Sequence, residues 1–158
     1  MSDNVQQRGG APVGYLSDLN PVEAAAVLYL RMWSEGPESQ AKMSRDIARI
    51  LGSGAGKAAL SAFDDLCSLC AHHGRRPLMR HSLKCGCIGA DECCFANLVG
   101  AASDGDQEDA MLIATMIVRA DMAPCLAGLA ETFGLALKRM ALMHTATAPQ
   151  NSTHTTLH

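Results

Sequence analysis

The chain has 158 residues, 48% of them hydrophobic and 18% charged, and a net charge of −3. These values are typical of one globular domain with a sizeable core, and they exclude a disordered or strongly basic chain. The longest apolar run covers only residues 110–118, far short of the roughly 20 residues that span a bilayer, and the N-terminus is polar. We therefore expect a cytoplasmic protein without a signal peptide or a membrane partner.

Only six side chains are aromatic, so the core must consist mainly of Ala, Leu, Ile, Val and Met. Small and unbranched apolar residues favour helices, whereas β-branched and aromatic residues favour strands. We predict an all-α fold, a compact bundle of about six helices with one long Cys-rich loop. The predicted divisions are a flexible N-terminal segment over 1–17, a single helical domain over 18–146 and a disordered tail over 147–158.

Helix signals follow one another along the chain. Asn20 and Pro21 form a cap and first turn ahead of a helix that extends to about Trp33. The glycine-rich stretch 52–56 is expected to separate the second helix from the third. The fifth predicted helix, over about 107–118, is apolar almost all round, which indicates a position at the centre of the bundle. The remaining helices are expected over about 38–51, 58–73, 91–102, 107–118 and from 121 onward.

The stretch 67–94 holds six of the seven cysteines and three of the six histidines. Thiolate and imidazole are the ligands with which proteins hold zinc or an iron–sulfur centre. One Cys-x2-Cys motif ends a predicted helix, and one His-x3-Cys-x-Cys motif lies in the long connection that follows. Their combined spacing is close to that of zinc sites built from two cysteine pairs. The candidate metal ligands, for zinc first and an iron–sulfur cluster as the alternative, are Cys67, Cys70, His81, Cys85 and Cys87.

Each motif also has a simpler explanation. Cys67 and Cys70 continue the apolar stripe of their helix, so packing in the core explains them as well. Cys85 and Cys87 are also explained as reduced surface thiols. The pattern His81-x3-Cys85-x-Cys87 is similar to the His-x3-Cys-x2-Cys motif of zinc-binding anti-sigma factors, with one residue fewer between the cysteines. This resemblance implies that the three residues bind zinc.

Cys93 and Cys94 follow Asp91 and Glu92 in the first turn of a predicted helix. The positive end of a helix dipole stabilises a thiolate, so either cysteine is a candidate reactive thiol. The two neighbouring carboxylates oppose that effect, and we interpret them as partners of the helix dipole. Cys125, near the start of the last helix, is expected to pack.

Basic residues gather in the long connection. Residues 71–90 carry four basic side chains and no acidic one, whereas the rest of the chain carries nine basic and sixteen acidic residues. Such a patch suits an acidic protein or a small anion, because four charges release too few counterions for tight binding of nucleic acid. The residues of this patch are Arg75, Arg76, Arg80 and Lys84.

Three functional hypotheses follow. In the first, a zinc-type site pins the loop to the third helix, and the protein is a structural or regulatory interaction module and not an enzyme. In the second, the protein is a thiol-redox protein or a metal-dependent enzyme. In the third, it is a purely packed helical domain without metal. The sequence has no recognisable nucleophile–base–acid arrangement, so we predict no catalytic residue.

Overall fold

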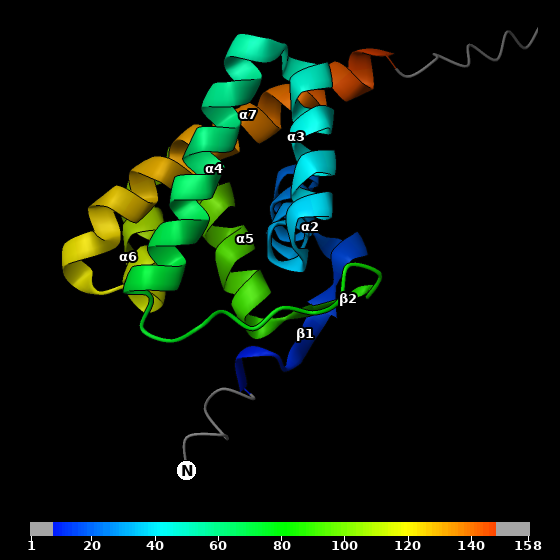
Figure 1. The fold of residues 1–158 in the computed structure, drawn as a ribbon. Coiled ribbons are helices and arrows are strands. Elements are labelled where there is room, and N and C mark those ends of the chain that lie inside the picture. Colours follow the sequence, from blue (N-terminus) through cyan, green and yellow to red (C-terminus); the bar gives the residue numbers. More distant parts are fainter. Residues whose placement is uncertain (1–7, 148–158) are drawn as a thin grey trace, which may run out of the picture.

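The computed structural model describes residues 8–147, which form a bundle of helices (Figure 1). The all-α prediction is confirmed, because six α-helices make up most of this part of the chain and a two-stranded sheet adds little to it. The helices are α2 (Pro21–Glu35), α3 (Pro37–Leu51), α4 (Ser53–His73), α5 (Ala90–Ser103), α6 (Gln107–Ile117) and α7 (Ala123–Thr147). The other elements are β1 (Pro12–Tyr15), β2 (Cys87–Gly89) and the short 3-10 helices η1 (Leu16–Asp18) and η2 (Ala120–Met122).

Local signals in the sequence set the helix ends. The side-chain oxygen of Asn20 accepts a hydrogen bond from the backbone N–H of Glu23 at 2.9 Å, and Pro21 opens the first turn of α2. The chain then turns at Gly36 and at Gly52, whose φ angles are 122° and 85°. These angles lie in the left-handed region that favours glycine, so each glycine ends one helix where the next begins.

The sequence predicted a non-helical break over residues 52–56. Only Gly52 lies outside a helix, because α4 already begins at Ser53. Gly56 lies inside α4 and against α3, where a Cβ atom would stand 3.0 Å from the Cα atom of Ala48. The glycine therefore permits close packing of two helices and does not mark a turn.

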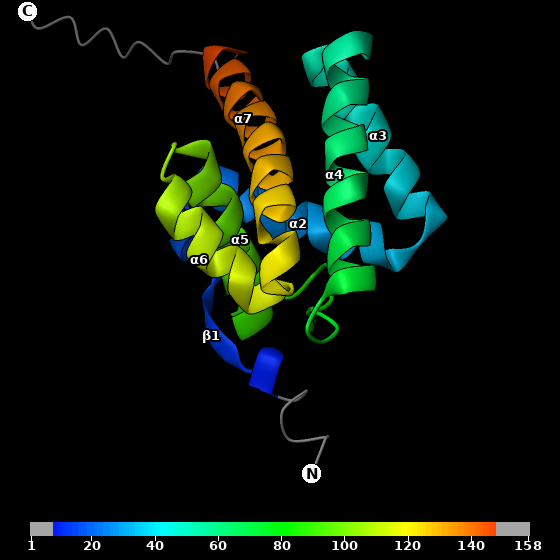
Figure 2. The same cartoon turned by 90° about the vertical axis from the view of Figure 1, so that its left-hand side faces the viewer.

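The core forms where α5 and α7 cross the other helices. Most residues of α5 are buried, and the helix packs against α2, α6 and α7 (Figures 1 and 2). Phe63 of α4 stacks on Phe133 of α7 with ring centroids 4.5 Å apart, and Tyr29 of α2 meets both rings edge-on. Gly134 lets α7 approach α5, since a Cβ atom there would lie 2.7 Å from Cβ of Ser103.

The expectation that the fifth helix lies at the centre of the bundle is wrong. This helix, α6, packs against α5 and α7 at the edge of the bundle (Figure 2). Ala110, Ala114 and Ile117 face the core, but Leu112 and Met116 are 65% and 66% exposed. The central position belongs to α5, whose small residues permit close approach of its neighbours.

A small sheet joins the N-terminal segment to the Cys-rich loop. β1 pairs with β2 in antiparallel register, Gly14 opposite Ile88 and Tyr15 opposite Cys87. The sequence analysis assigned both stretches to irregular structure, because each strand is too short to show alternation. Pairing with residues more than seventy positions away along the chain orders the described part of the N-terminal segment.

The other expectations about the chain ends and the membrane are tested only in part. Residues 1–7 and 148–158 lie outside the described residues, so the predicted flexible end and disordered tail stay predictions there. Within residues 8–147, no helix combines the length and hydropathy that crossing a bilayer requires.

Candidate functional site

The Cys-rich loop, residues 74–89, is anchored by one buried side chain of α2. Arg31 is 1% exposed, and all five of its side-chain N–H groups donate hydrogen bonds. Two reach the carboxylate of Glu92 at 2.6 and 2.9 Å. The other three reach the backbone carbonyl oxygens of Ser82, Cys85 and Cys87 at 3.1, 2.7 and 2.7 Å. One guanidinium thus holds the loop at three points.

Glu92 completes this anchor from the first turn of α5. Its carboxylate is fully buried and also accepts a hydrogen bond from the backbone N–H of Gly89 at 3.0 Å. Burial alone would raise the pKa of Glu92, but the hydrogen bonds from Arg31 and Gly89 hold the pKa below its ordinary value. The carboxylate is therefore charged, and it compensates a guanidinium that has no access to water.

A second ion pair holds the start of the loop. Arg76 binds the carboxylate of Asp91 with both terminal nitrogens, Nη1 at 2.6 Å from Oδ2 and Nη2 on Oδ1. The backbone N–H of Met79 donates to Oδ2 at 2.7 Å. Gly9 packs against this pair so closely that no Cβ atom would fit. Asp91 therefore holds the first half of the loop, and Glu92, together with Arg31, holds the second half.

A histidine and a cysteine meet in this loop. Nδ1 of His81 lies 3.5 Å from Sγ of Cys85, and Nε2 lies 2.7 Å from the carbonyl oxygen of Gly10. A carbonyl oxygen only accepts hydrogen bonds, so Nε2 carries the proton of the neutral ring and Nδ1 is left to accept the thiol proton. The ring is therefore oriented with Nδ1 toward the sulfur of Cys85.

These contacts favour the thiolate of Cys85. The hydrogen bond from His81, followed by that from the backbone of Cys87, lowers the pKa of Cys85 below its ordinary value. The same contact with Cys85 is the main reason why the pKa of His81 is raised. The two opposite shifts both favour transfer of the thiol proton from Cys85 to His81.

Cys67 and Cys70 have a different environment. Both are buried in the main hydrophobic core, as the packing explanation predicts. Burial raises the pKa of Cys70 to about 12 and raises the pKa of Cys67 as well, so both remain neutral thiols. Across residues 8–147, no group of three or more His, Cys, Asp and Glu side chains is arranged to hold a metal ion. The metal-site hypothesis for these two cysteines with His81, Cys85 and Cys87 stays a prediction.

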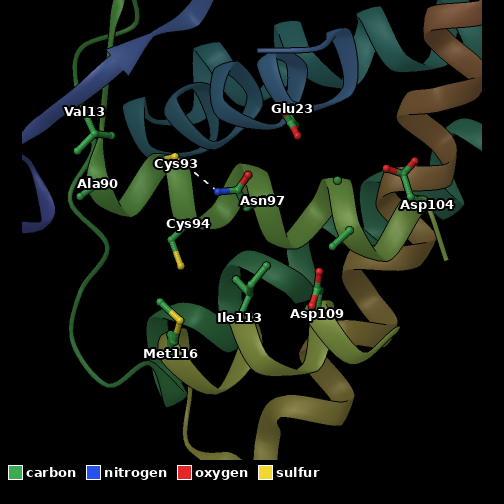
Figure 3. Close-up of a pocket in the computed structure, with 12 residues that line it drawn as sticks. Val13, Glu23, Ala90, Cys93, Cys94, Asn97, Asp104, Asp109, Ile113 and Met116 are labelled. Atoms are coloured by element: carbon green, nitrogen blue, oxygen red, sulfur yellow. Dashed lines mark hydrogen bonds between the residues drawn. The ribbon is translucent and has the colours of Figure 1, made fainter. Parts of the chain in front are cut away.

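Cys93 and Cys94 line an open groove between α5 and α6 (Figure 3). Burial raises the pKa of Cys94, and the charges of Asp91 and Cys93 add to that effect. This direction is opposite to the one that a reactive thiol at Cys94 requires, and the opposing effect of the neighbouring Asp91 agrees with the sequence-based expectation. Cys125 is exposed on α7, contrary to the expectation that it packs.

Three of the four basic residues of the loop donate hydrogen bonds within the described part of the chain. Arg76 is used in the ion pair described above, and Nε of Arg75 donates to the carbonyl oxygen of Thr115 at 2.6 Å. Nη1 of Arg80 donates to the carbonyl oxygen of Leu78 at 3.3 Å. Arg75, Arg80 and Lys84 are exposed. An acidic partner or a small anion at this patch stays a prediction.

The sequence analysis missed the anchor of the loop. Its signal was present, because Arg31 stands between Leu30 and Met32 inside an apolar helix, and a buried charge needs a partner. Glu92 was interpreted as a partner of the helix dipole, but it accepts hydrogen bonds from a guanidinium 61 positions away in the chain. No spacing rule connects the two residues.

Comparison with known proteins finds no matching family model, no similar curated protein and no similar solved structure.

The buried ion pair gives the first prediction. Replacing Glu92 by Gln leaves the charge of Arg31 buried without a counter-charge, so we expect the free energy of unfolding to fall by about 3 kcal/mol in urea denaturation. The matched control is Asp104→Asn, which weakens the exposed pair with Lys138 and should cost about 0–1 kcal/mol. Equal losses in the two variants would contradict the assigned role of the buried pair.

The second prediction concerns thiol reactivity. Near neutral pH, iodoacetamide should modify Cys85 first and exposed Cys125 more slowly, because only thiolates react quickly. Cys67 and Cys70 should react only when the protein is unfolded. His81→Gln should slow the modification of Cys85 about fivefold or more and leave Cys125 unchanged, since one pKa unit changes the thiolate population about tenfold. Peptide mapping by mass spectrometry measures each rate, and equal rates at Cys85 and Cys125 would contradict the assignment.

Proposed function

We propose that this protein is a thiol–disulfide redox protein whose reactive pair is Cys85 and Cys87. The contact of the Cys85 thiol with the imidazole of His81 carries the proposal. A cysteine beside a histidine whose other ring nitrogen is held by a third group is the arrangement that activates a thiol nucleophile. Here Gly10 supplies the third group through its carbonyl oxygen.

The proposed reaction uses a disulfide of a small molecule or a protein as the oxidant. The Cys85 thiolate attacks one sulfur of that disulfide and forms a mixed disulfide, and the departing thiolate takes the proton that His81 holds. Cys87 then gives its proton to His81 and attacks Sγ of Cys85, which releases the second substrate thiol. The substrate disulfide is reduced to two thiols, and the protein dithiol is oxidised to one disulfide.

The spacing of the two cysteines favours a reversible reaction. A Cys-x-Cys disulfide closes a short ring, and strained disulfides are reduced more easily than structural ones. Arg31 holds the carbonyl groups of both cysteines, so the backbone on either side of the ring is fixed before the bond forms. This anchoring supports exchange at one defined place in the loop.

The zinc-type module is a second proposal, and one observation favours it. The hydrogen bond from Nε2 of His81 to Gly10 leaves Nδ1 directed at Cys85, and such a bond also orients histidines that bind metals. Cys85 and Cys87 would then be ligands, and the loop would serve a structural or regulatory role. The two proposals compete for the same sulfurs, so one experiment can distinguish them.

The third prediction tests the exchange reaction directly. Reduced protein treated with glutathione disulfide should form a Cys85–Cys87 disulfide and retain no glutathione on that pair. In Cys87→Ser the second step is blocked, so glutathione should remain on Cys85. Intact-mass measurement and peptide mapping detect both products. Cys125→Ser, which removes an exposed thiol on α7, is the matched control and should still form the Cys85–Cys87 disulfide.

Two results would overturn the redox proposal. One is glutathione distributed over Cys85 and Cys125 without preference. The other is stoichiometric zinc in protein purified without chelator, together with a chelator-dependent gain in the reactivity of Cys85. That second result would support the zinc-type module.

A further inference from the structure

The groove that Cys93 and Cys94 line is separate from the reactive loop. It has a volume of about 570 Å³, and its walls come from α5, α6, β1 and the start of α2. This volume lies within the range of roughly 300–1,000 Å³ that is usual for ligand pockets. None of His81, Cys85 and Cys87 lines it.

The two ends of the groove differ in polarity (Figure 3). Val13 lies at one end, and the thiol of Cys94 points toward the side chain of Met116 across the opening. Toward the other end stand two carboxylates from opposite walls, Asp104 and Asp109. An apolar half therefore adjoins an acidic half within one opening.

The acidic half carries negative charge that is only partly compensated. Its carboxylates belong to Glu23, Asp104 and Asp109, and among the described residues that line the groove none is Lys, Arg or His. Lys138 pairs with Asp104 at 2.6 Å from outside the groove. Asp109 has no such basic partner among the described residues. Its contact with the side chain of Asp106 raises the pKa of Asp109. A cation would offset this repulsion.

The apolar half continues onto exposed side chains of α6. Met116 is 66% exposed at the edge of the groove, and Leu112, one turn earlier, is 65% exposed. Methionine side chains adapt to partners of varied shape. A neighbouring pair of exposed large apolar residues on one helix is the kind of surface that a binding partner covers.

We propose that this groove binds a positively charged amphipathic peptide helix. Its apolar side chains would lie against Cys94, Ile113 and Met116, and its Lys or Arg side chains would lie beside the acidic half. Charge complementarity argues for this occupant, because the groove offers carboxylates and no basic group to a ligand. An open apolar groove also matches recognition of one helix face. This inference is independent of thiol exchange at Cys85.

The test uses the reduced full-length protein and a fluorescent peptide of about 14 residues. Leucines at helical positions i, i+3, i+4 and i+7 form one face, and lysines form the other. We expect fluorescence anisotropy to report saturable binding that weakens as salt screens the charges. A peptide with glutamate in place of every lysine should not bind.

Matched variants locate the binding site. Glu23→Gln combined with Asp109→Asn should weaken binding about three- to tenfold, and Glu38→Gln, at an exposed acid on α3, should leave it unchanged. Met116→Ser should weaken binding about fivefold. Leu135→Ser is its control, because Leu135 is an exposed apolar residue of α7 that does not line the groove. Thermal melts check that every variant is folded.

Three results would overturn the proposal. The first is equal binding of the glutamate peptide, which would show that charge plays no part. The second is equal weakening by Leu135→Ser and Met116→Ser, which would place the contact outside the groove. The third is a dimer of the protein alone in sedimentation that Met116→Ser dissociates and the lysine peptide does not, which would make a second copy of the chain the occupant.

Discussion

The guanidinium of Arg31 is the constraint on which the described structure depends. Its five hydrogen bonds join α2, the Cys-rich loop and α5, three segments far apart in the chain. A loop of this length would ordinarily lose much conformational entropy on being ordered. Here a buried charge pair offsets part of that loss. The loop therefore has a defined backbone on which a histidine and a cysteine can be held in contact.

The same residue type has three kinds of environment in this molecule. Cys67 and Cys70 pack among apolar side chains, Cys94 lies in a groove beside an acid, and Cys85 contacts an imidazole at the surface of an anchored loop. Desolvation raises the pKa in the first two environments, and hydrogen bonding lowers it in the third. Clustering of cysteines in the sequence therefore does not mean that they act together.

The sequence predicted most of the helical architecture, because helix ends and apolar stripes are local. Asn20 and Pro21 marked the start of α2, and the stripe that includes Cys67 indicated burial. Properties that depend on distant partners could not be predicted in the same way. The apolar helix α6 looked central, but α5 occupies that place, and strands of three and four residues gave no periodic signal. The spacing of His81 and Cys85 suggested shared metal ligation, whereas their direct contact and the anchoring of the loop by Arg31 were not predicted.

Arg31 contacts the loop only through main-chain oxygens of Ser82, Cys85 and Cys87. No loop side chain takes part in those three bonds, so the identities of these residues are free to change while the path of the backbone is kept. The backbone path of the loop at these positions therefore does not depend on which side chains it carries. Substitution at positions 82, 85 and 87 would introduce other reactive or ligand-binding groups, and the hydrogen bonds from Arg31 would still hold the backbone in place.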